Sequence, residues 1–168
     1  VNKATNKVLK TYSYTVNKPI DTLSFYYNDG IWLDHVLSNK PGKLSNTNNT
    51  GYRFVFPTMN RYSNSGYDGP IDVIIRNYGG QVVGLAENIT KDRFSNYVEF
   101  AYSTPSVLNI ELVKHGTNES YIAGKKIHIQ IEMQRYKSKI TAIAEKADAS
   151  GTFNKVEATI NLADHFDF

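Results

Sequence analysis

The sequence predicts an all-β protein built as an antiparallel β-sandwich, and two observations carry this prediction. Short segments in which apolar and polar residues alternate recur about every 8–15 residues, separated by turns rich in Gly, Pro and Asn. Residue types that favour strands are common, including 12 tyrosines, and no long helical pattern interrupts them.

The expected strands follow one another with short breaks. The first half of the chain gives strands at 8–16, 23–27, 31–37 and 52–56, with Asn28-Asp29-Gly30 as a hairpin turn. The second half gives strands at 71–75, 81–85, 97–102, 107–113 and 127–133. Polar loops occupy 38–51 and 60–70, and we expect one helical turn within 86–94.

Composition narrows the classes of function. The 168 residues are 40% hydrophobic, which suits one domain with a proper core. The net charge of +3 comes without a run of five or more Lys and Arg residues, so we expect no nucleic-acid partner. The absence of cysteine excludes disulfides, thiolate metal sites and cysteine nucleophiles. No apolar stretch has transmembrane length and no signal peptide is visible, so an exported form would be the mature one.

The clearest strand lies within 122–137 and follows the turn Ala123-Gly124. Its apolar residues occupy alternate positions, namely Ile127, Ile129, Ile131 and Met133, with His128, Gln130, Glu132 and Gln134 between them. Alternation with period two predicts a strand with one buried face and one face in water.

A second alternating segment occupies 153–162. Its apolar face is made of Val156, Ala158, Ile160 and Leu162. Residues 138–152 are small, polar and charged, so we expect a linker there, with a helical turn around 140–146. The resulting division is a sandwich domain over 1–137, a linker over 138–152 and a terminal strand segment over 153–168.

The segment 122–137 resembles the C-terminal signature of chaperone–usher fimbrial subunits, the pilins. Gly124 is the fourteenth residue counted back from Lys137, and Tyr136 is next to last. This chain departs from the signature by continuing to Phe168. The resemblance implies an incomplete immunoglobulin-like sandwich over 1–137 that a donor strand from 153–162 completes.

The function implied by the resemblance is that of a structural subunit of a bacterial surface fimbria. Such a subunit polymerises by donor-strand exchange and supports adhesion to host cells. Val156, Ala158, Ile160 and Leu162 would fill a groove lined by Ile127, Ile129, Ile131 and Met133. The implied partners are neighbouring subunits, a periplasmic chaperone and an outer-membrane usher, with the final location outside the cell.

The position of the donor segment leaves two explanations open. In the family this segment precedes the body of the subunit, whereas here it follows. Either a donor strand has been moved to the C-terminus, or 153–162 is the native last strand of an unrelated sandwich. The second explanation would fit a domain of a secreted toxin or surface protein.

No residue pattern predicts catalysis. The four histidines lack a metal spacing such as HExxH, and nucleotide-binding and nucleophile motifs are absent. Asp68 and Asp72 flank a loop without the spacing of a calcium-binding loop. We therefore expect neither an enzyme nor a cofactor or metal site.

One loop predicts an alternative function as a carbohydrate-binding module or a fimbrial tip adhesin that recognises a host glycan or glycoprotein receptor. The loop 60–70 holds Tyr62, Tyr67 and Asp68, and aromatic faces beside polar groups suit sugar binding. The plainer interpretation is a solvated loop whose tyrosines fold over the sheet. Trp32, the only tryptophan, is expected in the core.

Overall fold

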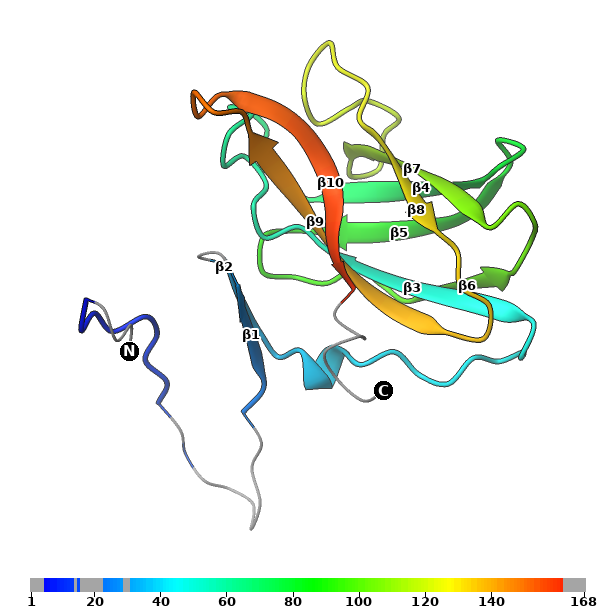
Figure 1. Cartoon of the computed structure of the whole chain (residues 1–168), viewed down its shortest axis with the longest axis horizontal. Coiled ribbons are helices and arrows are strands. Elements are labelled where there is room, and N and C mark those ends of the chain that lie inside the picture. Colours follow the sequence, from blue (N-terminus) through cyan, green and yellow to red (C-terminus); the bar gives the residue numbers. More distant parts are fainter. Residues whose placement is uncertain (1–4, 14, 16–22, 29–30, 162–168) are drawn as a thin grey trace.

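Two four-stranded sheets stacked face to face form the body of the molecule (Figure 1). The computed structural model describes residues 5–13, 15, 23–28 and 31–161. The predicted all-β class and β-sandwich are confirmed. The immunoglobulin-like arrangement implied by the resemblance stays a prediction.

The first sheet has the strand order β10-β9-β3-β6. Its strands are β3 (Asn49–Val55), β6 (Val98–Ala101), β9 (Ser138–Ala147) and β10 (Phe153–Asn161). Neighbouring strands run antiparallel except β3 and β9, which pair in parallel. A parallel pair needs a long connection, and here strands β4 to β8 lie between β3 and β9 in the chain.

The second sheet is antiparallel throughout, with the order β5-β4-β7-β8. Its strands are β4 (Ile71–Asn77), β5 (Val82–Ile89), β7 (Val107–Lys114) and β8 (His128–Glu132). Strand β5 replaces the first part of the helical turn expected within 86–94, because Ala86 and Ile89 are both buried in the core. Strand β8 shows the predicted alternation, with Ile129 buried and His128 exposed.

The main core fills the space between the two sheets. Fully buried side chains come from both of them, including Tyr52, Phe54, Ile71, Ile75, Leu108, Ile110 and Ile143. Tyr52 stacks between Phe54 and Phe100, with ring centroids 5.9 and 5.8 Å away. Such burial of large apolar side chains is the dominant favourable term in the folding of this domain.

A hairpin covers the outer face of the first sheet. It consists of β1 (Phe25–Asn28) and β2 (Ile31–Asp34), and the short 3-10 helix η1 (Leu37–Asn39) follows it. Leu33 and Val36 form a second core with Val55, Ile140 and Ala142 of the sheet beneath. The middle of the first sheet is therefore buried on both faces.

The prediction of a linker at 138–152 is wrong for most of that segment. Ser138–Ala147 form β9, a strand in the interior of the first sheet, and no helical turn occupies 140–146. Ile143 faces the main core while Ile140 and Ala142 face the second core. A strand buried on both faces does not alternate between apolar and polar residues, so the pattern that marks an exposed strand is missing.

The N-terminal segment also differs from expectation. Residues 8–13 and 15 form no strand, although a strand was expected at 8–16. Tyr14 and Val16 lie outside the described residues, as do Asp29 and Gly30 of the expected hairpin turn. In Figure 1 the N-terminal segment lies beside the hairpin, on the side away from the sandwich.

Candidate functional site

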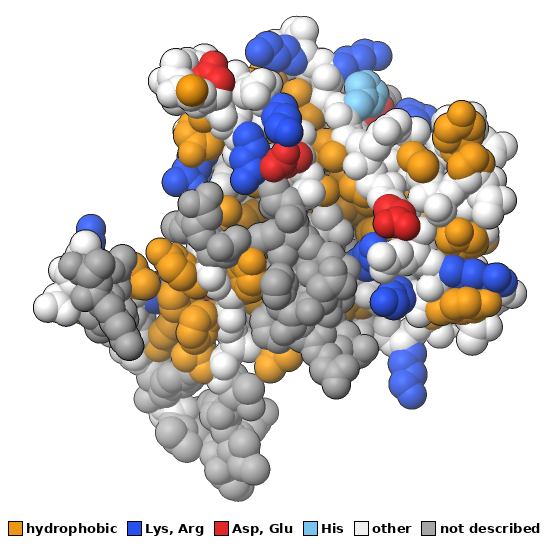
Figure 2. Space-filling view, in the orientation of Figure 1, with side chains coloured by type: hydrophobic (Ala, Val, Ile, Leu, Met, Phe, Trp, Pro, Cys, Tyr) orange, Lys and Arg blue, Asp and Glu red, His pale blue; other side chains and the backbone are white. Residues whose placement is uncertain are grey.

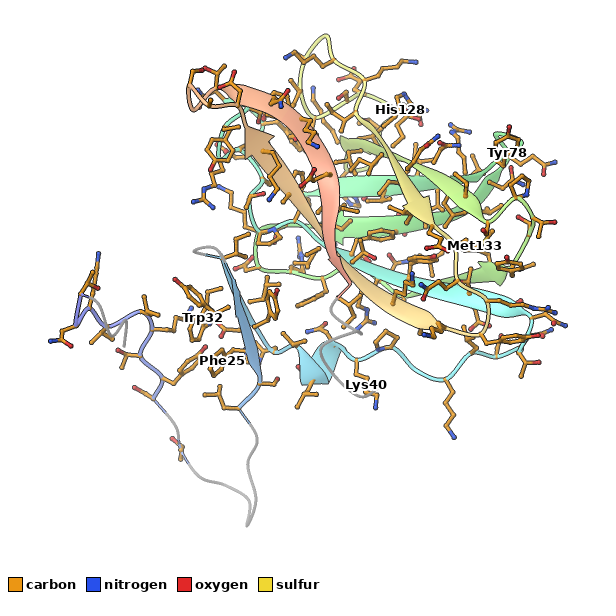
Figure 3. The ribbon with its side chains drawn as sticks, viewed as in Figure 1. Phe25, Trp32, Lys40, Tyr78, His128 and Met133 are labelled. Atoms are coloured by element: carbon orange, nitrogen blue, oxygen red, sulfur yellow. The ribbon has the colours of Figure 1, made fainter. Side chains whose placement is uncertain are left out.

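The outer face of the hairpin is aromatic. Because side chains alternate along each strand, Tyr26 and Leu33 face the sheet below while Phe25, Tyr27 and Trp32 face outward. Phe25 stacks on Trp32 at 4.5 Å with 12° between the ring planes. Figure 3 shows both rings pointing away from the sandwich, and Figure 2 shows apolar side chains gathered over this part of the surface.

Polar contacts hold the indole of Trp32 in place. Its Nε1–H donates to Asp34 Oδ1 at 2.6 Å and to Tyr12 Oη at 2.7 Å. The Tyr12 hydroxyl also donates to Asp34, and Lys10 Nζ lies 3.1 Å from Asp34 Oδ2. Burial raises the pKa of Asp34, but the hydrogen bonds from Tyr12 and Trp32 and the charge of Lys10 outweigh it and lower the pKa below its usual value.

A surface hollow of about 420 Å³ opens between the hairpin and the segment that follows β3. The residues that line it come from three separate parts of the chain, namely Ile31, Trp32, Pro57, Thr58, Met59, Arg61, Lys91 and Asp92. Among the lining residues, Thr58 and Met59 are almost fully buried, whereas Arg61, Lys91 and Asp92 are exposed. The hollow thus joins an aromatic side chain to two cations and a carboxylate.

Local contacts orient two of the charged residues that line the hollow. The Arg61 guanidinium lies over the ring of Tyr62, 5.4 Å from its centroid. Asp92 Oδ1 accepts a hydrogen bond of 2.8 Å from the Thr90 hydroxyl. These contacts restrict the side chains before any ligand arrives, which reduces the entropy that binding would cost.

A buried carboxylate fixes the loop that carries Arg61. Glu145 of β9 is 1% exposed, and its two oxygens accept five hydrogen bonds. The donors are Asn60 N at 3.0 Å, Tyr62 N at 2.8 Å, Ser63 N at 3.0 Å, Ser63 Oγ at 2.6 Å and Tyr121 Oη at 2.9 Å. Burial and then the charge of Glu145 raise the pKa of Tyr121, so this phenol stays a donor. Glu145 therefore fixes the backbone of the loop that carries Arg61 and forms one wall of the hollow.

The residues predicted for glycan binding lie in different places, and only Tyr62 adjoins the hollow. Tyr62 is half-buried and adjoins the hollow through Arg61. Tyr67 packs against the main core, its hydroxyl donates to Pro70 O at 2.6 Å, and Lys114 Nζ lies 5.7 Å from its ring centroid. Asp68 is exposed. Trp32 was expected in the core, but it lies half-buried at the hollow.

Two of the four predicted donor residues, Val156 and Ala158, meet predicted groove residues in the main core. Ile127, Ile129 and Met133 are buried, Ile131 packs against them, and Val156 of β10 belongs to the same cluster. Ala158 is partly buried against this cluster, whereas the side chain of Ile160 and all of Leu162 lie outside what the structure describes. Strand β10 pairs with β9, and β8 belongs to the other sheet.

The two residues of the pilin-like signature lie outside β8. Gly124 has φ +72° in the turn before the strand, a conformation that glycine adopts at no steric cost. Tyr136 is 56% exposed with φ +64°, and it follows the end of β8 at Glu132. The guanidinium of Arg135 lies 4.6 Å from the ring centroid of Tyr136. Tyr136 is therefore a turn residue leading into β9.

The chain matches no protein-family model, and no curated protein matches it. Within the described part of the chain, no helix is long and apolar enough to cross a membrane. Function therefore rests on the geometry of the hollow and of the strands.

Proposed function

We propose that this chain is a non-catalytic recognition domain that binds an acidic sugar of a glycan in the hollow between the β1–β2 hairpin and loop 57–61. The position of Trp32 carries the proposal. The only tryptophan of the chain lines the hollow, and Asp34 and Tyr12 fix its indole. A large aromatic side chain that is already held in place provides contact area at a low entropic cost.

The lining suits the chemistry of a sugar acid. The apolar face of a pyranose ring would lie against the accessible surface that Trp32 and Pro57 contribute to the hollow, and its hydroxyls would donate to Asp92. Arg61 and Lys91 would pair with the carboxylate of the sugar, and such charge-assisted hydrogen bonds are the strong ones. A volume of about 420 Å³ accommodates one or two sugar rings.

A glycan array that includes sialylated and uronate-containing sugars tests the proposal. We expect binding by the wild-type chain, with at least a tenfold loss of affinity in Trp32→Ala and in Arg61→Ala. Matched controls are Tyr78→Ala, an exposed tyrosine at the opposite end of the molecule (Figure 3), and the exposed Lys43→Ala. No binding to any acidic glycan, or equal binding by all four variants, would contradict the proposal.

A second candidate function is the one implied by the resemblance, a fimbrial subunit that assembles by strand exchange. The placement of β10 favours it. This last strand is the edge of the first sheet, and it contributes Val156 to the same core as Ile127, Ile129 and Met133. A neighbouring subunit that supplied an equivalent strand would bury the same apolar face. The chaperone, the usher and the surface location belong to this candidate.

The strand-exchange candidate is tested with a chain that ends at Gly151, which retains β9 and lacks β10. We expect this chain to aggregate alone, and to regain stability when a peptide of residues 153–162 is added. A peptide carrying Val156→Asp is the control and should have no effect. A truncated chain that is soluble and unfolds at the same temperature with or without the peptide would exclude strand exchange.

A further inference from the structure

Three potential metal ligands converge on one side of the second sheet. Asp72 comes from β4, Glu87 from β5, and His115 directly follows β7. One ligand atom from each lies within 4.8 Å of those from the other two. The positions are 15 and 28 residues apart along the chain (72 to 87, and 87 to 115), so only the pairing of β4 with both neighbours brings them together.

The aspartate of this cluster is already held in a fixed position. Asp72 is 3% exposed, and its Oδ1 accepts from Asn88 N at 2.9 Å while its Oδ2 accepts from Gly116 N at 2.9 Å. His115 Nδ1 lies 2.8 Å from the same Oδ1. Burying a charged carboxylate costs free energy, and a positive ion beside it would offset that cost. The imidazole of His115 next to it offers a nitrogen ligand.

The cluster opens to solvent through a second hollow of about 280 Å³. Glu87, Asn88, Arg93, Phe94, Asn96 and His115 line this hollow. Glu87 and His115 are exposed, so an ion can reach them without a change of fold. Arg93 donates to Asn88 O at 3.0 Å and to Asn88 Oδ1 at 2.8 Å, and Glu87 N donates to Asn96 Oδ1 at 2.6 Å. These bonds fix the backbone that presents Glu87.

We propose that Asp72, Glu87 and His115 bind a zinc ion. One imidazole and two carboxylates form a mixed nitrogen and oxygen ligand set of the kind that zinc accepts, and water would complete the tetrahedron. Two carboxylates also balance the charge of the ion. Binding replaces the hydrogen bond between His115 and Asp72 with bonds from both residues to the metal. The ion would join β4, β5 and the turn after β7.

Calorimetric titration of the whole chain with Zn²⁺ tests this site. We expect one ion per chain with a dissociation constant in the micromolar range or below, and at least a tenfold weaker constant in His115→Ala and in Glu87→Gln. His128→Ala, an exposed histidine on β8, is the matched control and should bind as the wild type does. Absence of binding, equal binding by His115→Ala, or binding of Ca²⁺ in preference to Zn²⁺ would overturn the proposal.

Cobalt provides a readout that does not depend on affinity alone. With Co²⁺ in place of Zn²⁺, we expect visible absorption typical of tetrahedral coordination, and its loss in His115→Ala. Zinc should also raise the melting temperature of the wild type and of His128→Ala, because it binds the folded state. A melting temperature that rises equally in His115→Ala would place the ion elsewhere and overturn the assignment.

Discussion

At the scale of single residues, buried carboxylates organise the loops. Glu145 accepts four hydrogen bonds from the loop between Asn60 and Ser63 and so ties this loop to strand β9. It accepts a fifth from Tyr121, and its own N–H donates to Thr58 Oγ1 at 2.7 Å. Hydrogen bonds to a charged acceptor are stronger than those between neutral groups. A single side chain therefore connects the interior of the first sheet with the wall of the hollow.

Glu145→Gln should reduce the free energy of unfolding by about 2–4 kcal/mol, because the new amide NH₂ group would face donors without an acceptor. Urea unfolding measures the change. The control is Glu119→Gln, whose side chain is 74% exposed and pairs with Lys114, and its effect should stay below about 1 kcal/mol. Equal effects of the two substitutions would show that the Glu145 contacts stabilise little.

A second carboxylate makes stability depend on pH. Hydrogen bonds from the Ser45 hydroxyl, then the Ser45 amide and the Asn49 side chain, lower the pKa of Glu99 to about 2 from an ordinary value of 4.5. The folded state thus prefers the charged form, so the stabilisation is complete above about pH 4.5 and is lost as the pH falls toward 2.

Glu99→Gln should therefore destabilise the chain at neutral pH, and the difference from the wild type should shrink as the pH falls toward 2, where about half of the folded wild-type molecules have Glu99 protonated. Unfolding curves of the two proteins from about pH 6 to about pH 2.5 measure the difference. A constant difference across this range would contradict the lowered pKa of Glu99.

At the scale of secondary-structure elements, the sequence predicted strands such as β8, whose residues alternate, but missed β9. Strand β8 alternates Ile129 with His128, and the pattern identified it. Strand β9 is buried on both faces, and its Ala-, Lys- and Glu-containing sequence resembled a linker. One partner, β10, follows β9 directly, but the parallel partner β3 lies far away in the chain, so β9 depends on tertiary contacts that the local sequence does not show.

Ile143→Ala in β9 should cost about 2–4 kcal/mol of unfolding free energy, because it leaves a cavity in the main core. Lys146→Ala on the same strand has a partly exposed side chain and should change stability by less than about 0.5 kcal/mol. Chemical denaturation measures both variants. A negligible effect of Ile143→Ala would support the linker expected from the sequence.

The candidate sites also combine a part that the sequence could predict with parts that only the fold brings together. The loop 60–70 could be singled out because Tyr62 and its neighbours are adjacent in the sequence. The hollow brings Trp32, Arg61 and Asp92 together from three segments. Because these segments are far apart in the chain, no local sequence pattern predicts that they line one hollow. The proposed zinc ligands Asp72, Glu87 and His115 are likewise brought together by strand pairing, so no metal-binding spacing along the chain marks them.

At the scale of the whole molecule, the hairpin forms a third layer on the two-sheet sandwich. Leu33 is 1% exposed and packs against Val55, Ile140 and Ala142, so the layer shares the first sheet with the main core. Val55 and Phe54 are adjacent on β3 and face the second and the main core respectively. The two cores should consequently unfold together.

Thermal unfolding tests this coupling with two probes. The fluorescence of Trp32 reports the hairpin and far-ultraviolet circular dichroism reports the sheets, and we expect the same midpoint for both. Leu33→Ala should lower the two midpoints equally. A fluorescence transition well below the dichroism transition would show that the hairpin melts as a separate unit.

The proposed recognition function is tested most directly at Trp32, because this single indole lies at the hollow and gives its own nuclear magnetic resonance signal. The measurement is a titration of the labelled chain with sialyllactose and, separately, with digalacturonate. The account predicts a saturable shift of the Trp32 indole N–H signal with at least one of these acidic sugars, while the amide of Tyr78 stays unmoved. An indole signal that stays in place at saturating concentrations of both sugars would contradict it.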